Sequence, residues 1–272
     1  MNQPCPKLVV IGGGTGLATV LRGLKAFDCN ITAIVTVADD GGSSGLLRKD
    51  MGILPPGDIR NCLLALAEAE PEMTALFNHR FSKGKLKGHC FGNLFLAAMT
   101  EMTGDFQEAI RAMSRILAVK GKVLPATLSD VSLVAEMDDG SVVFGETAIP
   151  LAKGKIKQLR LQPEDPPALD DAVDEIRAAD GIIIGPGSLF TSIIPNLLVR
   201  GIRQAVAEAA GCKLYICNVM TQPGETDGFD VLDHIQAIQD HAGPLFSHVL
   251  VNTAGAPQDV LEKYAEEGKY QV

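Results

Sequence analysis

A recurring pattern decides which folds are open to this chain: a short β-branched run, a glycine-rich loop, and then apolar residues at helical spacing. Lys7–Ile11 leads into Gly12–Gly16, and Leu17–Leu24 continues with helical periodicity. Ile31–Ala38 likewise ends abruptly in the polar, glycine-rich stretch Asp39–Gly45. Each unit therefore predicts a strand, a tight loop and a helix.

The same alternation returns in the second half of the chain. Helices are predicted over Ala168–Ala179, Ile202–Ala209, Val231–His241 and Pro257–Glu266, and strands over Gly181–Ile184, Lys213–Cys217 and His248–Asn252. Such alternation predicts parallel strands joined by crossover helices, an α/β fold. The turn signal Asp138-Asp139-Gly140 predicts a small antiparallel insert over about residues 123–161. No linker divides the chain, so a single domain over residues 1–272 is expected.

Charge and hydropathy exclude several classes of function. The 24 Lys and Arg residues against 33 Asp and Glu residues give a net charge of −9, which disfavours general binding to nucleic acid or anionic membrane. The apolar runs are too short to cross a bilayer, and Met1–Lys7 lacks the pattern of a secretory signal, so we expect a cytoplasmic protein without membrane insertion. One basic cluster, Arg80 to His89, is either solvated surface or a cationic flap over an anion.

Ligands of an open parallel sheet bind beyond the carboxyl ends of its strands, so each loop after a strand is a candidate site. The first loop supplies Gly12, Gly13, Gly14, Thr15 and Gly16, whose amides can approach phosphate oxygens closely. Its spacing fits neither the dinucleotide fingerprint nor the P-loop. Standard NAD or P-loop ATP binding is therefore disfavoured.

The next loops carry acids and small hydroxyl donors. Asp39 and Asp40 follow the second strand, where carboxylates either bind a ribose hydroxyl or hold Mg²⁺, and Ser43 and Ser44 come directly after them. At the predicted helix start after Pro55-Pro56-Gly57, Asp58 is placed to cap the helix. Candidates for phosphate or hydroxyl contacts at this and the next predicted helix start are Arg60, Asn61 and Asn93.

Two later loops complete the set. Gly185, Gly187 and Ser188 follow the apolar strand Gly181–Ile184, which is the strongest anion-site pattern in the chain. The loop after Lys213–Cys217 offers side chains that read hydroxyl groups and base edges: Asn218, Thr221 and Gln222. The sequence therefore predicts a polar site directed at phosphate.

The loops together resemble those of the YvcK-type gluconeogenesis factors, a group in one superfamily with CofD, the 2-phospho-L-lactate transferase. The resemblance rests on six separate strings: GGGTGL from Gly12, TVADDGGSSG from Thr36, LPPGDIRN from Leu54, HCFGNLFLAA from His89, GPGSLFTSIIPNLLV from Gly185 and NVMTQPGETDGF from Asn218. It implies a Rossmann-like, doubly wound, mostly parallel sheet. It also implies a UDP-sugar ligand and a role in cell shape during gluconeogenic growth.

Carried onto this sequence, the resemblance places the ligand among the residues already named. The string Leu54–Asn61 matches the gluconeogenesis-factor branch better than the transferase branch, which favours a sensor that acts through a regulatory protein partner. The alternative is a Mg²⁺-dependent transferase in which Asp40 and Asp58 hold the metal and a nucleotide diphosphate donor passes a phospho-group to a hydroxyl. No firm cofactor, catalytic residue or metal ligand follows, and homo-oligomer formation is left open.

One departure concerns the end of the chain. Relatives of this type continue past a further strand, whereas the sequence stops at Val272, so the C-terminal segment of the family is expected to be missing. Tyr264 lies on the last predicted helix, where it either stacks on a uracil ring or packs against the protein.

Overall fold

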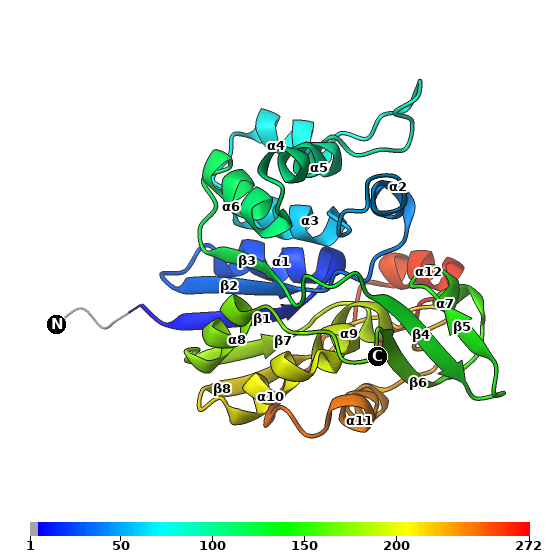
Figure 1. Ribbon diagram of the computed structural model, residues 1–272. Helices are drawn as coiled ribbons and strands as arrows, with labels where there is room; N and C mark the ends of the chain where they lie inside the picture. The colour runs from blue at the N-terminus through cyan, green and yellow to red at the C-terminus, as the bar shows by residue number, and fades with distance from the viewer. Residues whose placement is uncertain (1–4) are drawn as a thin grey trace.

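The first β-branched run forms a central strand of a six-stranded parallel sheet in the computed structural model, which describes residues 5–272 (Figure 1). The strand order is β3-β2-β1-β7-β8-β9, and every neighbouring pair is parallel. The strands are β1 (Lys7–Gly12), β2 (Asn30–Val35), β3 (Lys122–Pro125), β7 (Gly181–Ile184), β8 (Cys212–Ile216) and β9 (His248–Leu250). This is the doubly wound Rossmann order, in which the strand sequence reverses between β1 and β7.

The strands read as continuous apolar runs because helices cover both faces of the sheet. Val9, Val10 and Ile11 of β1 are at most 1% exposed. One face carries α1, α3 and α6, and the other carries α8, α10 and α11 (Figure 1). The α-helices are α1 (Gly14–Leu24), α2 (Gly42–Met51), α3 (Gly57–Leu66), α4 (Pro71–Asn78), α5 (Phe91–Thr103), α6 (Phe106–Ile116), α7 (Ala148–Leu151), α8 (Asp170–Arg177), α9 (Ile194–Leu198), α10 (Arg200–Glu208), α11 (Val231–Ala242) and α12 (Gln258–Glu266).

The antiparallel insert is shorter than the sequence predicts. It consists of β4 (Ser132–Met137), β5 (Val142–Phe144) and β6 (Ile156–Gln162), in the order β5-β4-β6. The predicted start at residue 123 is wrong, because β3 pairs parallel with β2 and belongs to the main sheet. Figure 1 shows the small sheet on the side toward which β1 and β2 point, beside the carboxyl ends of the main strands.

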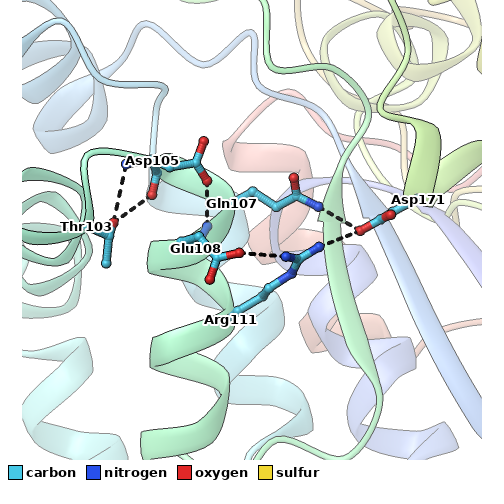
Figure 2. Close-up of polar contacts among 6 residues, drawn as sticks. All are labelled: Thr103, Asp105, Gln107, Glu108, Arg111 and Asp171. Atoms are coloured by element: carbon cyan, nitrogen blue, oxygen red, sulfur yellow. Dashed lines mark hydrogen bonds and ion pairs between the residues drawn. The ribbon is translucent and has the colours of Figure 1, made fainter.

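Helix α6 shows how local signals and tertiary contacts combine. The Asp105 side chain accepts a hydrogen bond from the Glu108 amide at 2.7 Å and so caps the N-terminus of the helix (Figure 2). One turn further on, Arg111 donates to both Glu108 and Asp171, the latter at 2.7 Å. Since Asp171 lies on α8, this contact ties together helices from opposite faces of the sheet.

Across residues 5–272, no helix combines the length and the apolar character needed to cross a membrane.

Candidate functional site

The loops after β1 and β7 meet where the strand order reverses. They border a pocket of about 320 Å³, here called the switch-point pocket. Its lining residues are Gly13, Gly14, Thr15, Gly16, Pro186, Gly187, Ser188, Asn218, Val219, Met220 and Gln222. Three loops far apart in the sequence therefore form one cavity beyond the carboxyl ends of β1, β7 and β8, where folds of this order bind ligands.

Glycine is required where the loops after β1 and β7 approach each other. A Cβ atom on Gly16 would lie 2.9 Å from the carbonyl oxygen of Pro186, closer than real Cβ atoms come to a backbone atom. A Cβ atom on Gly13 would lie 2.6 Å from Oδ2 of Asp58. The glycine-rich sequence after β1 thus lets the Pro186 carbonyl and the Asp58 carboxylate pack against the start of α1.

The N-terminus of α1 opens into the switch-point pocket. Within the described chain no side chain caps this helix, although the Gly14 amide donates to Asp58 Oδ2 at 2.7 Å. The amides of Thr15 and Gly16, in the first helical turn, remain available to a ligand, and the helix dipole adds partial positive charge there. This arrangement suits an anionic group such as phosphate.

The loop after β8 holds the loop after β7 in place. Asn218 accepts a hydrogen bond from the Gly187 amide at 3.3 Å and donates to the Gly187 carbonyl at 2.8 Å. Ser188 Oγ donates to Gln222 Oε1 at 2.7 Å. Thr221 faces a different neighbour, since its amide donates to the Tyr270 carbonyl at 2.7 Å and its hydroxyl accepts from the Tyr270 amide.

Asp58 has a role that the sequence does not predict. It does not cap α3; it lies in the first turn of that helix and joins α3 to the start of α1 through Gly14. Burial raises the pKa of Asp58 to about 6, while the Gly14 amide opposes the shift and nearby Asp39 adds to it. The nearby Asn61 side chain also opposes the rise in the pKa of Asp58, and its amide oxygen accepts a hydrogen bond from Arg60.

Glu146 joins these acids from the antiparallel insert, a contact that sequence spacing gives no means of finding. Its pKa lies well above the ordinary value because it is buried and because Asp39 is close and shares a hydrogen bond with it. Asp40, which is exposed, accepts from the amide and hydroxyl of Thr147 at 2.9 Å and 2.6 Å. The Asp39–Asp40 loop is thus bound to the insert.

Among the residues that the structure describes, no three His, Cys, Asp or Glu side chains form a group that could hold a metal ion. Asp58 accepts a hydrogen bond from the Gly14 amide and Asp40 accepts one from the Thr147 amide, and a magnesium site at these two carboxylates stays a prediction.

The predicted site residues that do not line the switch-point pocket include four that pack neighbouring helices: Ser43, Ser44, Arg60 and Asn93. Ser43 contacts His89 and Cys90, Asn93 donates to Ser44, and the buried Arg60 donates to Cys90 and Asn61. These residues pack α2, α3 and α5 together. Their hydrogen bonds have a structural role, and α2 itself begins inside the stretch that the sequence assigns to a loop.

Tyr264 also lies apart from the pocket lining. It is on α12, is 39% exposed, and has the Lys269 ammonium 5.7 Å from the centre of its ring. The position of Tyr264 gives no support to stacking on a base.

Three further polar residues around the site are missing from the sequence-based candidates. Asn196 donates to the Gly12 carbonyl at 2.9 Å and ties α9 to the end of β1. Ser192 lies beside Gly13 and Gly14. Glu225 is 4% exposed and accepts hydrogen bonds from Phe190, Thr191 and Gln222. Ser192 and Glu225 carry a sequence signal, since Ser192 comes within one turn of Gly185–Ser188 and Glu225 is an acid inside the polar loop after β8.

Comparison with known proteins agrees with this geometry. Residues 8–272 match the family described as 2-phospho-L-lactate transferase CofD. The gluconeogenesis factor of Bacillus subtilis is 55% identical over 264 residues, which cover 96% of this chain and 83% of that protein. The chain belongs to the CofD family, among the gluconeogenesis factors.

Solved structures support the same assignment for this family member. A crystal structure of a UPF0052 family protein from Bacillus halodurans superposes with a TM-score of 0.98 at 53% identity, covering all of this chain and 88% of that one. The predicted α/β, Rossmann-like fold is thereby confirmed. A putative gluconeogenesis factor from Nostoc is 57% identical over 98% of this chain, yet the chain spans only 59% of its length.

Proposed function

We propose that this gluconeogenesis factor binds a UDP-sugar in the switch-point pocket and acts as a sensor of that ligand. The observation that carries the proposal is the convergence of three loops on one cavity at the reversal of strand order. One wall of this cavity is the N-terminus of α1, and another wall carries the polar side chains of Asn218 and Gln222. The first wall suits a diphosphate, and the second suits hydroxyl groups.

In this proposal the diphosphate lies against the amides of Thr15 and Gly16. Sugar or ribose hydroxyls contact the side chains that follow β7 and β8. Binding then changes the affinity for a regulatory protein partner, through which the factor influences cell shape during growth on gluconeogenic carbon sources. A ligand can shift such an equilibrium only by its differential affinity for the two states.

A transferase is the second candidate, and the environment of Asp58 is the observation in its favour. A carboxyl whose pKa is about 6 can accept and return a proton near neutral pH, and Asp58 lies at the start of α1 beside the pocket. The family description 2-phospho-L-lactate transferase points the same way. In that case an acceptor hydroxyl would pass its proton to Asp58 and attack the phosphorus of the phospho-group bound at α1, and the P–O–P bridge would break with the nucleoside monophosphate as the leaving group.

Incubation with UDP-glucose and Mg²⁺ separates the two candidates. We expect saturable binding by isothermal titration calorimetry, with no time-dependent formation of UDP or UMP by chromatography. GDP-glucose serves as the matched control ligand. Steady release of UDP or UMP would replace the sensor by the transferase, and absence of binding would reject both.

A further inference from the structure

A chain of hydrogen bonds runs from the protein interior to the switch-point pocket through three residues of the loops after β7 and β8. Glu225 is at its buried end, with 4% of its surface exposed. Gln222 is in the middle and Ser188 is at the pocket end, and both of these residues line the pocket.

The buried end fixes the direction of the chain. Glu225 Oε2 accepts from the Phe190 amide at 3.1 Å, and Oε1 accepts from the Thr191 hydroxyl at 3.1 Å and from Gln222 Nε2. Burial raises the pKa of Glu225 to about 7, so above that pH its carboxylate is ionised and has no hydrogen to donate. The group of Gln222 that faces Glu225 must therefore be its NH₂ group.

The same constraint passes on to Ser188. With its NH₂ group toward Glu225, Gln222 presents its carbonyl oxygen to Ser188 Oγ at 2.7 Å. A carbonyl only accepts, so the single hydrogen of the Ser188 hydroxyl points at Gln222. Ser188 is left with lone pairs alone for a ligand in the pocket.

We infer that Glu225 is a positioning residue that makes Ser188 a hydrogen-bond acceptor, so that this corner of the pocket selects a ligand hydroxyl and disfavours phosphate oxygens. The inference rests on the proposed function, and it assigns hydrogen-bond donors and acceptors to different parts of the switch-point pocket. Phosphate then belongs at the α1 amides of Thr15 and Gly16, and a sugar or ribose hydroxyl belongs at Ser188. The Gly187 amide, already bonded to Asn218, does not offset this preference.

Substitution of Glu225 by Gln reverses the donor and acceptor roles along this chain of hydrogen bonds. The Phe190 amide still needs an acceptor, so the carbonyl of the new amide faces Phe190 and its NH₂ group faces Gln222. Gln222 must then turn its carbonyl toward the NH₂ group and donate to Ser188. The Ser188 hydrogen becomes free to bond a phosphate oxygen.

The test compares pyrophosphate, which has no hydroxyl group, with UDP-glucose by isothermal titration calorimetry at pH 8.5, where the Glu225 carboxylate is ionised. In the wild-type background, we expect Ser188→Ala to weaken UDP-glucose binding about tenfold and to change pyrophosphate binding less than about twofold. Glu225→Gln should strengthen pyrophosphate binding about fivefold or more, and the double variant Glu225→Gln/Ser188→Ala should lose this gain. A gain from the mere removal of negative charge would persist in the double variant and would overturn the inference.

Other outcomes are equally decisive. If Ser188→Ala lowers the affinity for both ligands equally, Ser188 is a hydrogen-bond donor to phosphate. That result would overturn the inference while leaving the proposed function intact. If Glu225→Gln does not fold, Gln222→Met removes the middle of the chain and should produce the same gain for pyrophosphate, and no gain would contradict the inference. Failure of the wild type to bind either probe would contradict the proposed function itself and the inference with it.

Discussion

The lack of a side chain at Gly16 determines how closely two loops of the site approach each other. A methyl group at this position would meet the Pro186 carbonyl at 2.9 Å and force the loops after β1 and β7 apart. We expect Gly16→Ala to lower the free energy of unfolding by about 1–3 kcal/mol and to weaken UDP-glucose binding more than tenfold. Urea unfolding and calorimetry measure the two effects.

Gly23→Ala is the matched control because it makes the same substitution in the same helix. Nothing lies within 4 Å of a Cβ atom on Gly23, so the alanine should stabilise the protein by about 0.5–1 kcal/mol and leave binding unchanged. Equal effects of the two substitutions would show that the close contact at Gly16 does not shape the pocket.

Asp58 should make stability depend on pH. Its pKa is raised from 3.8 to about 6 in the folded protein, chiefly by burial, so folding favours the protonated form. The stability that this preference contributes is present below about pH 4 and is lost as pH rises through 6, a change of about 2–3 kcal/mol. Asp58→Asn keeps an acceptor for the Gly14 amide and should remove this loss.

Urea unfolding at pH 4.5 and pH 7.5 tests the prediction for Asp58. The stability of Asp58→Asn relative to wild type should be higher at pH 7.5 than at pH 4.5. Asp50→Asn, at an exposed carboxylate, should show no such difference. The same difference at both pH values for Asp58→Asn would contradict the raised pKa.

At the scale of elements, the strands were the most predictable part of the chain. The strand predicted over Gly181–Ile184 agrees with β7 at both ends, because a continuous apolar run bounded by glycine has few alternatives. Helix α2 was not predicted, since GSSGLLRKDM buries only Ser43, Ser44 and Leu47 and shows little periodicity. Its conformation depends on packing against α5, which the local sequence does not encode.

Helix α6 allows a local cap to be compared with a long-range ion pair. Asp105→Ala removes the side-chain bond to the Glu108 amide and should lower the free energy of unfolding by about 1 kcal/mol. Asp171→Ala breaks the ion pair between Asp171 and Arg111, two side chains that are each about half exposed. This substitution should lower the free energy of unfolding by less than about 0.5 kcal/mol. Urea unfolding of the two variants measures both; a larger loss for Asp171→Ala would mean that the link between α6 and α8 dominates.

At the scale of the whole molecule, the sheet order decides which predicted loops meet. The sequence locates Gly12–Gly16, Gly185–Ser188 and Asn218–Gln222 after strands, and the reversal between β1 and β7 brings them to one pocket. Arg60 and Asn93 also follow the pattern of helix starts, but their helices pack against each other away from the pocket lining. Which helix starts face the ligand depends on tertiary packing, which residue spacing does not reveal.

Glu146 shows the same limit from the other side. Its hairpin insert is visible in the sequence, whereas its approach to Asp39 depends on how the small sheet rests beside the carboxyl ends of the main strands. The sequence therefore predicts which residues belong to the loops of the site better than it predicts which of those residues contact one another.

A crystal structure of this chain with bound UDP-glucose is the most direct test of the switch-point pocket. We expect the diphosphate to lie within hydrogen-bond distance of the Thr15 and Gly16 amides, with a ligand hydroxyl at Ser188. A diphosphate bound elsewhere, for example among the basic side chains between Arg80 and His89, would contradict this expectation.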